Sequence, residues 1–253
     1  MSNPGIMEPK SRILLPLDTD TTEKAVSLAL KLSGHVAGFK IGLELINAVG
    51  FGIFDDLREA VGDNIKIFYD CKFHDIPNTV AGATRAAARR GIWILDIHAT
   101  GGAAMMRASV AAAKEAAPKN PPLVIAVTVL TSIDQGNLTG ELGVNRSVSD
   151  HVVALACLAQ DCGCDGVVAS PHEVSAIRDA CGDSFVLVVP GVRPAGADIG
   201  DQKRVMTPSE AVQAGADYLV IGRPIYAAPD PLAACKAIND ELSQHIPSPA
   251  SRP

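Results

Sequence analysis

Short apolar runs rich in β-branched residues alternate with longer amphipathic stretches along almost the whole chain. Such runs are typical of strands, and their lack of polar alternation indicates strands that are buried on both faces. The eight runs that we expect to form strands cover residues 13–17, 36–41, 65–69, 92–97, 123–130, 166–169, 185–189 and 218–221.

The stretches between these runs carry helical spacing and helix-boundary residues. Apolar residues recur three and four positions apart after Thr22, which predicts a helix there. Pro208 begins another helical stretch that Gly215 ends, and an alanine-rich helix is expected between Asn78 and Gly91. Strands and helices are therefore expected to alternate along the chain.

Buried strands separated by helices predict a parallel sheet with right-handed crossovers and helices on both faces. Eight repeats within 253 residues fit a closed (β/α)8 TIM barrel of the α/β class best, and an open doubly wound sheet is the alternative. No linker is apparent, so we expect a single domain over residues 1–253, with flexible tails at 1–11 and 243–253. Aromatic residues make up only 4% of the chain, so the core must be built from aliphatic side chains.

Composition and charge argue against several classes of function. The formal net charge is −6 and no run of Lys and Arg exceeds two residues, so we expect no nucleic-acid partner. No segment is apolar over the roughly 18 residues that a membrane span requires, and the first twelve residues lack the apolar core of a signal peptide. The six cysteines are scattered, which is typical of reduced thiols in a cytoplasmic protein.

Ionisable residues gather where the expected strands end, which is the edge of a barrel that carries functional groups. Asp70 and Lys72 follow the third strand two positions apart, so their side chains share one face of an extended segment. Asp75 lies on the next loop, and Lys40 lies at the end of the neighbouring strand. A simple ion pair is the alternative, but packing alone does not require so many charges in one cleft. We therefore expect these four residues to be catalytic.

Two glycine-containing loops after the last two expected strands predict a phosphate site. Pro190 and Gly191 precede Arg193 in one loop, and Gly222 precedes Arg223 in the other. Barrels often bind phosphate where these loops meet, because glycine lets backbone N–H groups approach the oxygens and arginine adds a charged fork. Arg223 is the stronger candidate, and Arg193 is either a second ligand or a surface residue.

The long loop over residues 192–206 is either a lid that closes over a ligand or an ordinary loop. From a lid, Gln202 would reach both ends of a bound phosphorylated ligand. His98 follows the fourth strand and is either a hydrogen-bond partner of the carboxylates or a structural histidine. His74 and His172 are expected to be exposed, and no motif has metal-site spacing.

The segment from Asp70 to Thr79 reads DCKFHDIPNT and resembles the signature of the orotidine 5′-monophosphate decarboxylase family. Its Asp-x-Lys-x-x-Asp core is shared with related sugar-phosphate barrels, whereas its continuation is specific to the decarboxylases. The resemblance covers almost the whole chain, from Asp18 after the first strand to Arg223 after the eighth. It implies a barrel that removes CO2 from orotidine 5′-monophosphate (OMP) to give UMP without metal or organic cofactor.

Residue roles are also implied by this resemblance. It assigns the charged network around the scissile carboxylate to Asp70, Lys72, Asp75 and Lys40, with Lys72 stabilising and then protonating the C6 carbanion. It implies a homodimer, in which Asp75, Ile76 and Thr79 reach into the site of the neighbouring subunit. It also implies that Asp18 and Lys40 contact the ribose and that Thr131 contacts the pyrimidine. The phosphate contacts that it implies are Gln202, Gly222 and Arg223. Pro190 and Arg193 are implied to contact the substrate, at a group that is not specified.

Two alternatives remain open on the sequence alone. A Mg2+-dependent sugar-phosphate decarboxylase or aldolase uses the same scaffold and the same core motif, and needs the metal to hold an enediolate. A non-catalytic barrel that senses a phosphorylated ligand is the second alternative. Binding alone, however, does not demand an ammonium group between two carboxylates, as Lys72 is placed.

Overall fold

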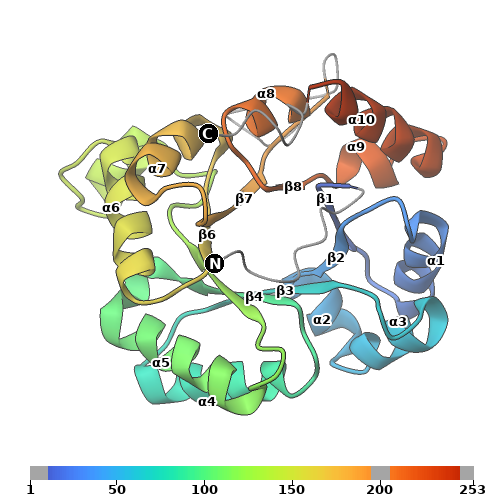
Figure 1. The fold of residues 1–253 in the computed structure, drawn as a ribbon, viewed down its shortest axis with the longest axis horizontal. Coiled ribbons are helices and arrows are strands. Elements are labelled where there is room, and N and C mark those ends of the chain that lie inside the picture. Colours follow the sequence, from blue (N-terminus) through green and yellow to red (C-terminus); the bar gives the residue numbers. More distant parts are fainter. Residues whose placement is uncertain (1–10, 195–205, 246–253) are drawn as a thin grey trace.

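The computed structural model describes residues 11–194 and 206–245, which form a (β/α)8 barrel (Figure 1). Its parallel strands pair in chain order, and β1 (Ile13–Pro16) closes the ring by pairing with β8 (Tyr218–Val220). This closure confirms the TIM barrel and excludes the open doubly wound sheet. The other strands are β2 (Gly38–Ile41), β3 (Ile67–Phe73), β4 (Ile94–His98), β5 (Leu123–Val127), β6 (Gly166–Val168) and β7 (Val186–Pro190).

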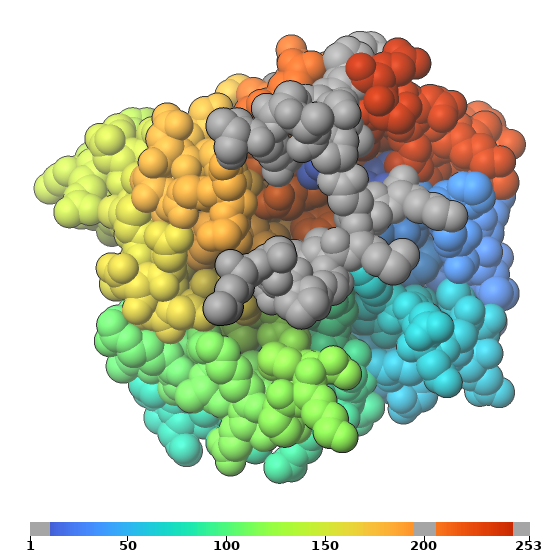
Figure 2. All heavy atoms as spheres, viewed as in Figure 1, coloured from blue at the N-terminus to red at the C-terminus, as the bar shows by residue number. Residues whose placement is uncertain are grey.

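Helices surround the barrel (Figure 1), and in Figure 2 the blue atoms of the region of α1 lie beside the red atoms of the region of α10. Asn239 of α10 donates a hydrogen bond to the carbonyl of His35 at 2.8 Å. This bond links the last helix to the loop between α1 and β2. Among the described residues, no helix has both the length and the apolar character needed to cross a bilayer. The helices are α1 (Thr22–Leu32), α2 (Leu43–Val49), α3 (Ile53–Val61), α4 (Pro77–Ala88), α5 (Gly102–Ala116), α6 (Val148–Asp161), α7 (Val174–Cys181), α8 (Pro208–Gln213), α9 (Arg223–Tyr226) and α10 (Pro231–His245), with short turns η1 (Ala99–Gly101), η2 (Asn137–Glu141) and η3 (Pro171–Glu173).

The predicted elements agree with the observed ones except near their ends. Strand β3 runs on to Phe73 instead of ending at residue 69, whereas β5 ends at Val127 instead of residue 130. Ser11 is buried and residues 243–245 belong to α10, so the prediction that these residues form part of flexible tails is wrong. The rest of those tails and most of the expected lid, including Gln202, lie outside the described residues.

The apolar side chains form two layers because successive residues of a strand point to opposite faces. One layer lies between the strands and the helices, and the other fills the barrel. Such an interior layer makes the barrel a packed core and not a pore. The buried residues of the interior layer are Leu14, Phe68, Ile94, Ile125 and Val188.

Charged residues occupy the next inward-facing positions toward the carboxyl ends of the strands. Asp70 lies two residues beyond Phe68 on β3, and Asp96 lies two residues beyond Ile94 on β4, so each shares the inward face. Lys40 of β2 lines the same cavity as these two carboxyl groups. The strand alternation therefore places a layer of ionisable side chains directly above the apolar layer that fills the barrel.

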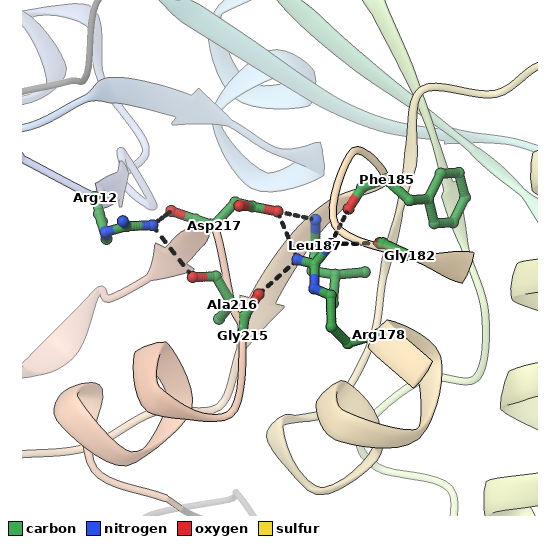
Figure 3. Close-up of polar contacts among 8 residues, drawn as sticks. All are labelled: Arg12, Arg178, Gly182, Phe185, Leu187, Gly215, Ala216 and Asp217. Carbon is green, nitrogen blue, oxygen red and sulfur yellow. Dashed lines mark hydrogen bonds and ion pairs between the residues drawn. The ribbon is translucent and has the colours of Figure 1, made fainter. Parts of the chain in front are cut away.

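A polar network holds the opposite end of the barrel, at the start of β8 (Figure 3). Arg178 of α7 donates to the carboxylate of Asp217 at 3.0 Å, and the same carboxylate accepts the backbone N–H of Leu187 at 2.8 Å. The network thereby joins a helix to two neighbouring strands. The carbonyl oxygens that accept the other N–H groups of this guanidinium belong to Gly182, Phe185 and Gly215.

We expect Asp217→Ala to lower the free energy of unfolding by roughly 3 kcal/mol, because it removes the carboxylate that neutralises the partly buried guanidinium of Arg178 and leaves the backbone N–H of Leu187 without its acceptor. Urea unfolding followed by circular dichroism measures the change. Lys24→Ala is the matched control, since it removes an ion pair with Asp20 in which both side chains are about two-thirds exposed. The control should leave the unfolding midpoint nearly unchanged. An equally small effect of Asp217→Ala would contradict the role given to the network.

Candidate active site

A row of alternating charges lies at the carboxyl ends of the first three strands. The ammonium of Lys40 lies 3.3 Å from a carboxylate oxygen of Asp18 and 3.0 Å from Oδ2 of Asp70. The other oxygen of Asp70, Oδ1, accepts a hydrogen bond from the ammonium of Lys72. Both oxygens of Asp70 are therefore held by lysines. The structure brings together four of the predicted site residues in one continuous network.

Mutual attraction keeps the centre of this row ionised. Burial by itself raises the pKa of Asp70, but the ammonium groups of Lys40 and Lys72 outweigh burial and hold that pKa below its ordinary value. Burial likewise lowers the pKa of Lys40, and the carboxylates of Asp70 and Asp18 outweigh it and raise that pKa. A buried, charged carboxylate thus stands beside Lys72 at neutral pH.

Glycine follows β2 where the ammonium of Lys40 needs space. A Cβ atom built on Gly42 would lie 2.7 Å from Nζ of Lys40 and within 4 Å of carboxylate oxygens of Asp18 and Asp70. Any side chain there would push the ammonium away from its carboxylates. Gly42 is therefore part of the site, although sequence analysis gave it no role.

Lys72 has an unusual backbone conformation. Its φ is 47°, and it is the only non-glycine residue with positive φ in the part of the chain that the structure describes. The left-handed region costs an L-residue roughly 1–2 kcal/mol, so surrounding contacts must hold Lys72 there. The conformation coincides with a register shift in the pairing of β3 with β4, between Tyr69 and Phe73. The predicted common face of Asp70 and Lys72 is confirmed by their ion pair, but β3 reaches it through a bulge.

Asp96 is a buried site residue that sequence analysis missed. Its Oδ1 accepts the backbone N–H of Lys72 at 2.7 Å, and its side chain is almost completely inaccessible. Burial raises the pKa of Asp96 well above its ordinary value and the charge of Asp70 adds to this, which favours the protonated form. The available signal was a single carboxyl residue inside the apolar run 92–97, two residues before the strand exit at His98.

These charges form one wall of a cavity of about 190 Å³, and the other walls are apolar. Thr131 and Pro190, both predicted to bind substrate, also line the cavity. Thr128, at the same strand end as Thr131, instead donates to the carbonyl of Val168 at 2.9 Å and is buried. The apolar part of the lining consists of Phe68, Val127, Val129, Leu130, Val168, Ala169 and Val220.

Of the predicted phosphate residues that the structure describes, neither Gly222 nor the two arginines line this cavity. Gly222 packs closely, because a Cβ atom there would lie 2.8 Å from Cγ of Pro16. Arg223 is exposed at the start of α9, whereas Arg193 is only 7% exposed and is therefore not the surface residue considered as an alternative. Burial and Asp18 raise the pKa of Tyr226, and the guanidinium groups of both arginines lower it. The net effect is a raised pKa of Tyr226, chiefly because of burial.

The residues expected to serve a neighbouring subunit do not line the cavity. Asp75, Ile76 and Thr79 are exposed, and none of them lines it. A carboxylate oxygen of Asp75 accepts the backbone N–H of Ile76 at 2.6 Å, which shapes the loop before α4. These three residues therefore do not join the charged row within this chain, although sequence analysis expected Asp75 to belong to the same network.

Histidines flank the site without entering the charged row. The ring of half-buried His98 packs 5.4 Å from the ring of His74, and burial lowers the pKa of His98, with His74 and Lys72 contributing. His74 and His172 are exposed, as predicted. Within the described ranges, no three His, Cys, Asp or Glu side chains are grouped to hold a metal ion.

Comparison with known proteins gives the family. Residues 11–238 match the model of the orotidine 5′-phosphate decarboxylase / HUMPS family. Proteins named orotidine 5′-phosphate decarboxylase are similar over nearly their whole length. One from Moorella thermoacetica is 52% identical over 239 residues, covering 93% of this chain and 94% of the relative, and one from Heliobacterium modesticaldum is 46% identical, covering 95% and 99%. The crystal structure of the enzyme of that name from Lactobacillus acidophilus has a TM-score of 0.80 at 35% identity, covering 92% of this chain and 99% of that one. The chain belongs to the orotidine 5′-phosphate decarboxylase / HUMPS family.

Proposed function

We propose that this protein decarboxylates OMP to UMP in pyrimidine biosynthesis, without metal or organic cofactor. Its similarity to proteins named orotidine 5′-phosphate decarboxylase supports the reaction. The observation that carries the proposal is the ammonium of Lys72, held on Asp70 at the boundary between a charged wall and an apolar cavity.

The chemistry of the substrate explains why such an ammonium is needed. Loss of CO2 from C6 leaves an electron pair in an sp2 orbital that the pyrimidine ring cannot delocalise. A fixed cation beside C6 stabilises this charge more than it stabilises the substrate, and it then supplies the proton that replaces CO2. Lys72 would fill this role, and Asp70 would lie near the departing carboxylate and repel it. The apolar walls would exclude water from the carbanion.

The size of the cavity indicates that the pyrimidine, the ribose and the phosphate of the nucleotide bind at different parts of the site. A cavity of about 190 Å³ is smaller than the roughly 300–1,000 Å³ of pockets that hold whole drug-sized ligands, so it suits the pyrimidine alone. Thr131 and Pro190 would contact this ring. The ribose would lie at Asp18 and Lys40, and the phosphate would lie beyond the cavity at Gly222, Arg223, Arg193 and Gln202.

The ion pairs of both Asp70 oxygens argue against the Mg2+-dependent alternative. A metal-dependent sugar-phosphate barrel needs free carboxylate oxygens for its cation. Here the two oxygens of Asp70 each face a lysine ammonium. We therefore expect turnover of OMP, followed spectrophotometrically, to persist in EDTA. Loss of turnover in EDTA, or Mg2+-dependent turnover of a hexulose or keto-gulonate phosphate in its place, would contradict the proposal.

We also infer that the active unit is a homodimer. Ile76 is 67% exposed although it is a large apolar residue, and it lies on the same loop as exposed Asp75. Burial of this side chain against a second copy of the chain would remove apolar surface from water, which supports the inferred contact. In that dimer, Asp75, Ile76 and Thr79 of each subunit would complete the site of the other.

Mixing two inactive variants tests the shared site. We expect Lys72→Ala and Asp75→Asn to be nearly inactive alone, and their mixture to regain roughly a quarter of wild-type activity after subunit exchange. Half of the dimers are then mixed, and each mixed dimer has one site that lacks both changes. Lys72→Ala mixed with Asp70→Asn is the control, because both residues belong to the same site. Equal recovery in the two mixtures, or none in either, would contradict the inferred dimer.

The proposal places the enzyme in the cytoplasm. All six cysteines are free, and five of them are buried. Free, buried thiols are typical of proteins in reducing compartments. Neither a nucleic-acid partner nor a membrane partner is part of the proposed function.

A further inference from the structure

One buried carboxyl group beside Lys72 has no role in the function proposed above. Asp96 is 1% exposed on β4, and its Oδ1 accepts the backbone N–H of Lys72 at 2.7 Å. The backbone carbonyl of Asp96 also accepts the thiol of Cys71 at 3.1 Å. A single residue of β4 thus contacts two consecutive residues of β3, one through its side chain and one through its backbone.

The pairing of the two strands explains why these contacts are needed. Tyr69 pairs with Leu95 and Phe73 pairs with Ile97, so residues 70–72 of β3 lie opposite Asp96 alone. Extra residues in a bulge are left out of the regular ladder and need other partners. Lys72 is one of these residues, and its left-handed φ of 47° turns its N–H toward the Asp96 carboxyl group.

The side chain at position 96 must accept a hydrogen bond without adding charge. Asp70 is its neighbour in the same cavity wall and is ionised. A second negative charge there would compete with Asp70 for the ammonium of Lys72. A protonated carboxyl group meets both requirements, because its carbonyl oxygen accepts the N–H and its O–H carries no charge. A carboxamide meets them as well, which makes asparagine the natural conservative replacement.

We propose that Asp96 is a positioning residue for the reaction, which holds Lys72 in the bulge so that its ammonium meets Asp70 and the reacting carbon. The inference rests on the proposed function, since it takes Lys72 as the proton donor to C6. Asp96 acts through the backbone of Lys72 and needs no contact with the substrate. The predicted consequence is that removal of its acceptor lowers the rate of the chemical step more than it weakens binding.

Two substitutions separate positioning from simple structural support. Asp96→Val removes the acceptor in a strand-compatible side chain, and we expect kcat for OMP to fall about a hundredfold, as misplacement of a reacting group by about 1 Å does. The KM should stay within about threefold of wild type, because binding contacts remain. Asp96→Asn keeps the acceptor and should retain kcat within about fivefold. A hundredfold loss in Asp96→Asn would overturn the proposal, as would wild-type kcat in Asp96→Val.

A second measurement does not depend on turnover. With 15N-labelled lysine, the amide of Lys72 should exchange slowly with solvent in the wild type and in Asp96→Asn, and at least tenfold faster in Asp96→Val. Equal protection in all three proteins, or loss of protection in Asp96→Asn, would overturn the proposal. Absence of OMP turnover in the wild type would instead contradict the proposed function, and the exchange experiment would still test the role of Asp96. Thermal unfolding of each variant shows whether it is folded under the assay conditions.

Discussion

Lys72→Ala is expected to lower kcat for OMP by at least about ten-thousandfold, because it removes both the cation that stabilises the C6 carbanion and the acid that protonates it. Each of these contributions alone is typically worth a hundredfold or more. The fold should survive, since Asp70 keeps its contact with Lys40 at 3.0 Å. A spectrophotometric assay under single-turnover conditions measures the rate.

Binding of the product provides the internal control for this variant. UMP has no carboxylate at C6, so its affinity should change far less than kcat when the ammonium is removed. Isothermal titration with UMP tests this for Lys72→Ala and for Lys24→Ala, an exposed lysine of α1 that serves as the matched control. A Lys72→Ala protein that binds UMP and keeps near-normal turnover would refute the proposed acid. A protein that has lost both would indicate a structural role for Lys72.

The fold was predictable because its signals are local. A buried parallel strand needs a short apolar run, and such runs appear in the chain at every observed strand. The closure of the ring followed from the number of runs, and pairing of β1 with β8 confirms it. Asp70 and Lys40 were found because both are charged residues at strand ends, where a barrel places its functional groups.

The parts that sequence analysis missed depend on contacts between strands. The bulge in β3 exists only relative to β4, and no glycine marks it, since the residue with positive φ is Lys72. Asp96 was overlooked because it lies inside an apolar run, where a strand was read as continuous core. The burial of Arg193 likewise depends on its neighbours in space, including a hydrogen bond from its backbone N–H to the carbonyl of Met206 at 3.0 Å. Periodicity along one segment carries no information of this kind.

The phosphate assignment can be tested by comparing two ligands that differ only in that group. Arg223→Ala is expected to weaken binding of UMP by roughly 10- to 150-fold, because a hydrogen bond to a charged group contributes about 1.5–3 kcal/mol. Binding of uridine should hardly change, since it lacks the phosphate that this guanidinium would hold. Arg89→Ala, which removes an exposed arginine at the end of α4, should affect neither ligand. Titration of the wild type and of both variants with each ligand gives the six affinities that are compared. An equal loss for UMP and uridine would mean that Arg223 supports the loop after β8 and does not bind phosphate, and the buried Arg193 would then be the stronger candidate for that contact.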